Sequence, residues 1–176
     1  MKTIITLQNG KKLNKYQFID YFERKVLYTI RKYDLLKSLK CFGNERVILP
    51  KVEKLLILSK IKNVFISQEC MDDIAYSFLL TFMKKESDKS LNKKIKGLLP
   101  KYNYQNKETI RPFYLIKKEE ILIYAYIKKI KLKKNKTKKD LTEKKMNLWI
   151  SDLERKHLEI KNAIVNSLLK IEEIEK

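Results

Sequence analysis

Two adjacent carboxylates, Asp72 and Asp73, are the residues of this sequence whose surroundings most suggest chemistry. A short apolar run at 64–67 leads to them, and a longer apolar stretch at 74–83 follows at once. This pattern predicts a strand that turns directly into a helix, the place where parallel α/β sheets bind ligands. The pair could be an acid/base pair, a magnesium ligand, or carboxylates that offset the helix dipole. Position alone favours the last role.

Arg111, beside Pro112 in a second predicted strand, is another candidate. It could hold a phosphate, or it could be a surface arginine, and the sequence leaves both alternatives open. The chain's three glycines are scattered at positions 10, 43 and 97, so no glycine-rich phosphate-binding loop is present.

The metal-ligating residue types are scarce. Cys41, Cys70 and His157 are the only cysteines and histidine, too few for a four-ligand structural zinc site. Buried, unreactive cysteines are the commoner interpretation of such thiols. We therefore expect no bound metal and no resident cofactor.

The net charge predicts a polyanionic partner. Lys and Arg number 41 against 21 Asp and Glu, a net charge of +20, which points to nucleic acid. A solvated outer face is the favoured alternative for the basic residues of the first predicted helix, whereas the length of the lysine run at 128–139 favours nucleic-acid binding. The candidate nucleic-acid contacts are Arg24, Lys25, Arg31, Lys32, Lys128, Lys129, Lys131, Lys133, Lys134, Lys136, Lys138 and Lys139.

No stretch approaches the roughly 20 apolar residues that span a bilayer. The first residues, MKTII, carry no long apolar core and no small-residue cleavage site. We expect a cytoplasmic protein without a membrane partner.

The pattern of apolar residues predicts a single domain over residues 1–176, of the α/β class and predominantly helical. A small hairpin at 1–13 turns at Asn9-Gly10, and a long helix at 14–36 begins with a capping box of Asn14 and Gln17. A reduced α/β core at 41–131 follows, and a C-terminal helical hairpin at 140–176 ends the chain.

Within this core the sequence predicts a helix at 47–60 and a strand at 64. A helix at 71–85, a mobile polar connection at 86–107, a strand at 109–114 and a helix from Lys117 come next. Two strands joined through a helix imply a minimal parallel sheet. Asp140 and Glu143 are predicted to form a second capping box, and a last helix is predicted from about Leu158.

Several segments, in order, resemble one known family. Residues 14–33, NKYQFIDYFERKVLYTIRKY, resemble the N-terminal helix of the TtuA-type tRNA 2-thiouridine synthetases, archaeal and cytoplasmic enzymes of the N-type ATP pyrophosphatase class. Residues 67–73, SQECMDD, are similar to the family's Thr-Gly-His-Asn-Leu-Asp-Asp segment. Residues 110–125 resemble its Arg/Lys-Pro-Leu strand and Glu-Ile…Tyr-Ala helix, and residues 153–161 resemble its C-terminal helices.

The departures from the family are as informative as the matches. The family's ATP-binding loop, Ser-Gly-Gly-Lys-Asp-Ser, its cluster-holding cysteines and its two zinc ribbons have no counterpart in the sequence. The resemblance therefore implies a truncated, degenerate relative with a reduced adenine-nucleotide-hydrolase-like core. In it, Asp72, Asp73 and Arg111 would be vestiges of a catalytic site, and ATP and Mg²⁺ would bind only if a partner supplied the phosphate loop.

The resemblance implies a non-catalytic tRNA-binding or accessory protein. Its partners would be tRNA or another RNA, and either a second copy or a full-length thiolation enzyme. Two alternatives stay open. One is an active ATP-dependent tRNA-modifying enzyme with an unusual site at Asp72, Asp73 and Arg111, and the other is a basic helical nucleic-acid-binding protein unrelated to thiolation.

Overall fold

A four-stranded sheet is the centre of the computed structural model, which describes residues 3–7, 10–35, 51–61, 64–83, 88–104, 107–132 and 141–174. Its strands are β3 (Lys60–Ile61), β4 (Val64–Ile66), β5 (Lys101–Tyr104) and β6 (Lys107–Ile110), in the order β3-β4-β6-β5. The inner strands β4 and β6 run parallel, with Ile66 opposite Ile110, so the predicted parallel pair is confirmed. The edge strands β3 and β5 pair antiparallel with their neighbours and were not predicted.

The N-terminal hairpin is also confirmed. Strands β1 (Ile5–Thr6) and β2 (Lys12–Leu13) pair antiparallel, and Gly10 adopts a φ of 79° in the connection. Such a left-handed conformation suits glycine.

Helix α1 (Lys15–Lys32) begins as predicted and ends earlier. The Asn14 side chain accepts hydrogen bonds from the backbone N–H groups of Tyr16 and Gln17, and the Gln17 side chain accepts one from Asn14 N–H. This confirms the capping box. The predicted end at 36 is wrong, because Asp34 adopts a φ of 50° and turns the chain out of the helix.

The helix predicted at 47–60 is mostly absent from the part that the structure describes. Only α3 (Val52–Leu55) is helical there, Lys60 belongs to β3, and residues 47–50 lie outside the described ranges. Hydrogen bonds from elsewhere shorten the helix: Gln68 Nε2 donates to the carbonyls of Leu55 and Leu58, and Ile66 N–H donates to that of Ser59. These carbonyl groups therefore accept hydrogen bonds from β4 and the residues after it, and do not accept the helical hydrogen bonds that would continue α3.

The mobile connection predicted at 86–107 is wrong. Helix α4 (Met71–Met83) is followed by α5 (Asp88–Gly97) and by strand β5. Ile95 and Leu99 are buried, and Leu91 and Leu98 pack against the same cluster. These apolar positions recur at helical spacing within a lysine-rich run, whose composition hid them.

Strand β6 and the helix after it differ from the prediction in their bounds. The strand ends at Ile110 rather than at 114, because residues 111–116 turn, with Tyr114 N–H donating to Arg111 and Ile116 N–H to Phe113. Helix α6 (Lys118–Ile127) follows as predicted.

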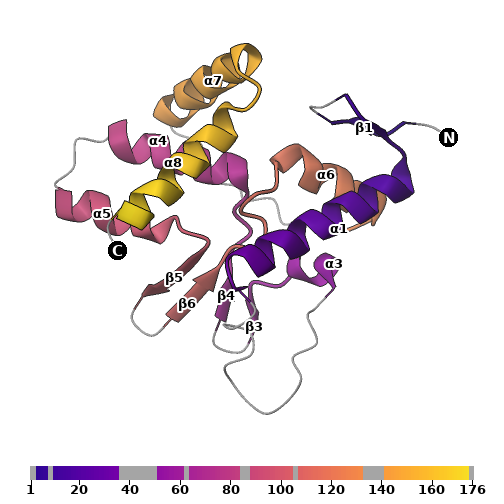
Figure 1. Cartoon of the computed structure of the whole chain (residues 1–176), viewed down its shortest axis with the longest axis horizontal. Coiled ribbons are helices and arrows are strands. Elements are labelled where there is room, and N and C mark those ends of the chain that lie inside the picture. Colours follow the sequence, from indigo (N-terminus) through magenta and orange to yellow (C-terminus); the bar gives the residue numbers. More distant parts are fainter. Residues whose placement is uncertain are drawn as a thin grey trace.

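Two helices complete the chain. α7 (Leu141–Lys156) and α8 (Ile160–Ile174) contact each other, and both pack against α4 (Figure 1). α8 begins two residues after the predicted start, and the capping box predicted at Asp140 and Glu143 lies outside the described residues and side chains. No helix of the described ranges is long and apolar enough to cross a membrane.

Two buried clusters divide the interior. The first joins α1, α3 and α6 to one face of β4 and β6, where Val64, Ile66 and Ile110 are buried. The second lies among α4, α5 and α8, beyond the ends of the parallel strands (Figure 1). The ends of β4 and β6 therefore lie at the junction of both clusters.

Candidate functional site

The carboxyl ends of β4 and β6 lie side by side, as the sequence predicts for a site. Ser67 N–H donates to the Ile110 carbonyl at 2.9 Å, which continues the parallel ladder past the strands. Met71 N–H donates to the Ile116 carbonyl at 2.9 Å. The turn at 67–70 and the turn at 111–117 are thereby held together, with α4 and α6 beginning beside each other.

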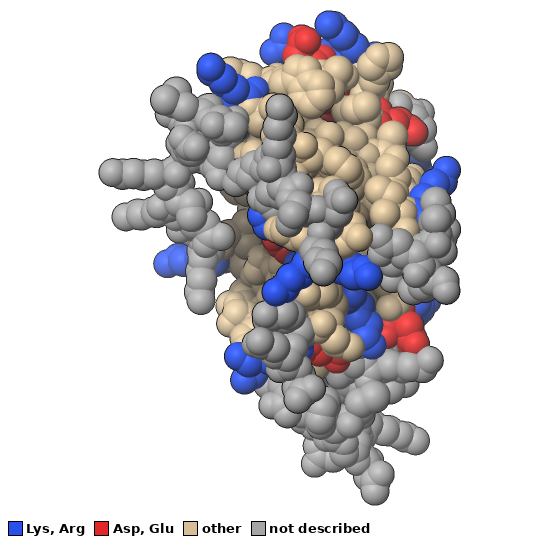
Figure 2. All heavy atoms as spheres, turned by 90° about the vertical axis from the view of Figure 1, so that its left-hand side faces the viewer, with Lys and Arg blue, Asp and Glu red and all other residues tan. Residues whose placement is uncertain are grey.

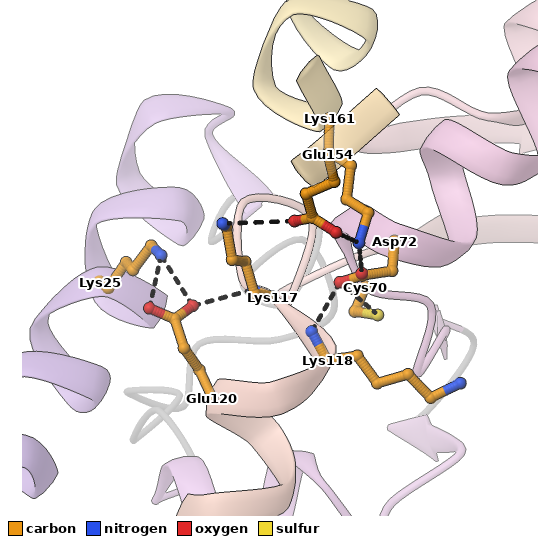
Figure 3. Close-up of polar contacts among 8 residues, drawn as sticks. All are labelled: Lys25, Cys70, Asp72, Lys117, Lys118, Glu120, Glu154 and Lys161. Atoms are coloured by element: carbon orange, nitrogen blue, oxygen red, sulfur yellow. Dashed lines mark hydrogen bonds and ion pairs between the residues drawn. The ribbon is translucent and has the colours of Figure 1, made fainter. Parts of the chain in front are cut away.

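Asp72 joins three helices at this point. Its Oδ1 accepts a hydrogen bond from Lys161 Nζ of α8 at 2.6 Å, and its Oδ2 accepts one from the backbone N–H of Lys118 at 2.7 Å (Figure 3). The carboxylate therefore satisfies an N–H group at the start of α6, which no helical carbonyl can reach. Both of its oxygens are bound within the protein.

Asp73 makes local contacts at the start of its own helix. Its Oδ2 accepts a hydrogen bond from Cys70 N–H at 3.1 Å and one from the Cys70 thiol at 3.0 Å. Lys118 Nζ lies 3.9 Å from Oδ1. These are the contacts of carboxylates at a helix start, the role that their position favoured.

Cys70 is buried, in agreement with the unreactive interpretation. Burial, followed by the charge of Asp73, raises the pKa of the Cys70 thiol far above its usual range. The thiol therefore stays protonated at neutral pH, whereas a nucleophile would have to be a thiolate. Cys41 lies outside the described residues.

Arg111 is buried, so the alternative of a surface arginine is wrong. Its side chain is 8% exposed, and its Nε donates to Glu69 Oε2 at 2.7 Å. Nη1 and Nη2 donate to the carbonyls of Leu99 and Gly97, each at 2.7 Å. The guanidinium thus fastens the junction of α5 and β5 to the strand ends. A phosphate bound here would have to displace one of these acceptors.

Lys161 ends the segment 153–161 that carries the resemblance, but no role was predicted for it. Its Nζ lies 2.6 Å from Asp72 Oδ1 and 2.6 Å from Glu154 Oε2 of α7. Burial lowers the pKa of Lys161, but the hydrogen bonds and charges of Asp72 and Glu154 outweigh burial and raise it. One signal was present in the sequence: a cation in the first turn of a helix opposes the dipole and calls for a carboxylate partner.

A second carboxylate, Glu120 of α6, holds α1 in place. This buried side chain accepts hydrogen bonds from Lys25 Nζ at 2.8 and 2.9 Å, from Tyr21 Oη at 2.9 Å and from Lys117 N–H at 2.8 Å. Figure 3 shows the polar contacts running from Lys25 through Glu120, Lys117 and Glu154 to Lys161 and Asp72. Lys25, a predicted nucleic-acid contact, is thus part of an internal ion pair.

Lys128, the first residue of the predicted lysine run, is similarly engaged. Its Nζ lies 2.6 Å from Glu53 Oε1 of α3 and 3.5 Å from Glu23 Oε1 of α1. The hydrogen bond with Glu53 raises the pKa of Lys128 and outweighs the effect of burial. Two of the predicted nucleic-acid contacts, Lys25 and Lys128, therefore also hold helices together.

The other predicted contacts in the described ranges are exposed. Arg24 pairs with Asp20 at 2.9 Å on the surface of α1, where such a pair contributes little to stability. Arg31 and Lys32 end the same helix, and Lys129 and Lys131 follow α6. The remaining members of the run lie outside the described residues: Lys133, Lys134, Lys136, Lys138 and Lys139.

Helix α5 carries further exposed lysines, Lys93, Lys94 and Lys96, which lie in the segment predicted to be a mobile connection. Figure 2 shows the side of the molecule where α5 lies, with Lys and Arg gathered across its middle, a mainly uncharged area above them, and further charged side chains of both signs along the upper edge. Among the described residues, no group of three or more His, Cys, Asp or Glu could hold a metal ion.

Solved structures include chains with a similar fold. The U34-tRNA thiolase NcsA from Methanococcus maripaludis, solved with its 4Fe-4S cluster, superposes with a TM-score of 0.64. The fold of the chain is similar to that of a tRNA thiolase. The superposition covers 96% of this chain and 84% of the thiolase chain, with 14% sequence identity. At this identity the likeness to the thiolase concerns the fold alone. No protein-family model and no curated protein sequence matches the chain.

Proposed function

We propose that this protein binds tRNA and acts, without catalysis of its own, as an accessory of cytoplasmic tRNA thiolation. One joint observation carries the proposal: a thiolase-like fold over 96% of the chain, together with a net charge of +20. The solved structure with the similar fold is a tRNA thiolase, and a large positive charge favours binding to a polyanion such as tRNA.

The exposed cations support the binding part of the proposal. Arg31, Lys32, Lys129 and Lys131 are exposed, and Arg24 is engaged only in a surface pair. Each Lys or Arg that neutralises a phosphate releases a counterion, so binding by such residues is strong at low salt and weakens as salt rises.

The strand-end contacts support the non-catalytic part. Asp72 is bound to Lys161 and to Lys118 N–H, Arg111 is bound to Glu69 and two carbonyls, and Cys70 is buried and protonated. For a reaction to occur here, these hydrogen bonds and ion pairs would have to break before the side chains could contact a substrate. We propose that ATP and Mg²⁺ bind only where a partner completes the site.

A competition assay tests the binding proposal. Labelled tRNA bound to the protein is challenged with unlabelled tRNA and with duplex DNA of equal phosphate number, at several salt concentrations. We expect tRNA to compete more effectively than duplex DNA at every salt concentration. Equal competition would instead favour a basic protein that binds nucleic acid for reasons unrelated to thiolation.

The enzymatic alternative keeps one observation in its favour, the position of Asp72 and Asp73 at the ends of the parallel strands. Its test is ATP-dependent release of pyrophosphate in the presence of tRNA. We expect no release above background. Release that disappears in the Asp73→Ala variant would establish an unusual active site and end the non-catalytic proposal.

The accessory role also needs a partner, and the sheet offers an edge for one. Strand β5 lies at the edge of the sheet, and unpaired edges of this kind pair readily with another chain. We propose association with a second copy or with a full-length thiolation enzyme. Native mass spectrometry at micromolar concentration, with and without such an enzyme, should detect a complex, and a stable monomer in both samples would refute the association.

A further inference from the structure

Helix α1 displays one tyrosine ring among cations. Tyr28 is 56% exposed and belongs to neither buried cluster, whereas Phe18, Phe22, Val26 and Ile30 of the same helix fill the first cluster. The packing of α1 therefore does not account for the exposed ring.

The neighbours of Tyr28 on the helix surface are basic. Arg24 stands four residues before it and Arg31 three residues after it, so both lie on its face of the helix. The Nζ of Lys32 lies 5.9 Å from the centroid of the Tyr28 ring. A ligand can therefore contact the exposed face of the Tyr28 ring and the neighbouring cations at the same time. Arg24 and Arg31 lie on either side of the ring, about 10 Å apart along the helix axis.

An aromatic ring between cations matches the chemistry of an unpaired nucleotide. Bases of single-stranded segments stack on exposed aromatic side chains, while cations beside the ring neutralise the phosphates of the same strand. In a duplex the bases stack on one another, so the ring would have no base to contact. The arrangement therefore favours a single-stranded segment over a helical stem.

We propose that Tyr28 is a stacking residue for an unpaired RNA base, with Arg24 and Arg31 holding the phosphates on either side of that base. This inference rests on the proposed RNA-binding function and adds to it the part of the RNA that α1 contacts. Lys32, whose Nζ lies between the rings of Tyr28 and Tyr33 at 5.9 and 5.4 Å from their centroids, is close enough to contact the adjoining backbone.

Binding to matched RNAs tests the inference. The affinities of wild type, Tyr28→Ala and Tyr28→Phe are measured for a hairpin with an unpaired loop and for a fully paired duplex with the same number of phosphates. Loss of one stacked base should lower the affinity of Tyr28→Ala for the hairpin roughly tenfold and leave duplex affinity unchanged. Tyr28→Phe should bind as wild type does, because the ring is kept.

Two control variants separate stacking from charge. Tyr16→Ala removes a 75% exposed tyrosine from the other end of the same helix and should bind both RNAs as wild type does. Arg31→Gln should weaken binding to the hairpin and reduce the slope of log affinity against log salt by about one unit. Tyr28→Ala should leave that slope unchanged.

A direct mapping guards against indirect effects of the substitutions. Ultraviolet crosslinking of the wild-type complex, followed by trypsin digestion, should place nucleotides on the peptide 26–31, VLYTIR, whose only aromatic residue is Tyr28. The inference is overturned if wild type binds the hairpin while Tyr28→Ala binds it equally well, or if crosslinks occur only on other peptides. Wild type that binds no RNA at all would instead overturn the proposed function and the inference with it.

Discussion

At the scale of single residues, Arg111 is a buried cation and Lys161 a partly buried one, and the contacts of both reach across the chain. Lys161 is 14% exposed and joins Asp72 of α4 to Glu154 of α7, and Arg111 joins the strand ends to the start of β5. Removing one partner of a buried pair leaves the other partner's charge without compensation. Both residues can therefore be tested through stability.

Lys161→Met should lower the free energy of unfolding by about 2 kcal/mol, because two carboxylates lose their cation. The loss is smaller than for a fully buried pair, since Asp72 and Glu154 still reach solvent. Urea unfolding followed by circular dichroism measures it. The control is Lys156→Met, which removes an exposed pair with Asp152 and should change stability by less than about 0.5 kcal/mol. Equal effects of the two substitutions would contradict the structural role of Lys161.

Arg111→Lys should lower the free energy of unfolding by about 2–3 kcal/mol, although it keeps the charge, because buried acceptors lose their hydrogen-bond donors. A single ammonium cannot replace the guanidinium fork that reaches Glu69 and the carbonyls of Gly97 and Leu99 together. Urea unfolding again provides the measurement, with Arg24→Gln as an exposed control. A variant as stable as wild type would mean that these three contacts do not hold the strand ends.

Tyr33 should make the stability of the protein fall at alkaline pH. Burial, followed by the charge of Tyr28, raises the pKa of Tyr33 from its ordinary value of 10.0 to about 12. The folded state thus holds this proton more tightly than the unfolded state. The part of the free energy of unfolding that depends on this proton is therefore fully present below pH 10 and is lost as the pH rises from 10 to 12.

Tyr33→Phe should therefore lose less stability than wild type between pH 10 and 12, by up to about 2 kcal/mol. At pH 7 the variant should be as stable as wild type or more stable, because the buried Tyr33 hydroxyl has no hydrogen-bond partner among the described residues. Urea titrations at pH 7, 10 and 12 provide both comparisons. Parallel curves for the two proteins over the whole range would refute the prediction.

At the scale of elements, α1 and α6 could be predicted from sequence and α3 and α5 could not. The buried residues of α1 recur at helical spacing behind a local capping box, so the signal is contained in the segment itself. The short α3 is set by hydrogen bonds from Gln68, which lies beyond the next two strands. Helix α5 is polar apart from its few packed residues, which join those of α4 and α8 in the second buried cluster, and its main contacts are with α4.

The candidate site, too, has a part that could be predicted from the sequence and a part that could not. The strand, turn and helix around Asp72 and Asp73 are a local pattern, so their place at the strand ends could be predicted. The ion pair of Asp72 with Lys161 joins residues 89 positions apart. No periodicity or spacing in either segment identifies such a partner. The sequence therefore could not show that the side chains of the site are bound to other residues of the protein.

Ile95 tests whether α5 is a packed helix or the mobile connection that its composition suggested. Ile95→Ala should lower the free energy of unfolding by about 2–3 kcal/mol, because it opens a cavity in the second buried cluster. Asn92→Ala, on the exposed face of the same helix, should have little effect. Urea unfolding distinguishes the two elements, and a neutral Ile95→Ala would favour the mobile connection.

At the scale of the whole molecule, the thiolase-like fold and the charge of +20 have to be explained together. Several cations hold elements together, as Lys25, Lys128, Lys161 and Arg111 show, and other cations are exposed on α1, on α5 and after α6. So large a net charge costs stability through self-repulsion, which a bound polyanion would relieve. The central claim is that this polyanion is tRNA.

Recovery of bound RNA from the native cell tests that claim most directly. The tagged protein is crosslinked to RNA in living cells and purified under denaturing conditions, and the attached RNA is sequenced against the input. We predict that tRNA is enriched over ribosomal and messenger RNA, and that the enrichment falls when Arg24, Arg31 and Lys32 are replaced by Gln. Attached RNA with the composition of the input, or no attached RNA, would contradict the claim that the protein binds tRNA in the cell.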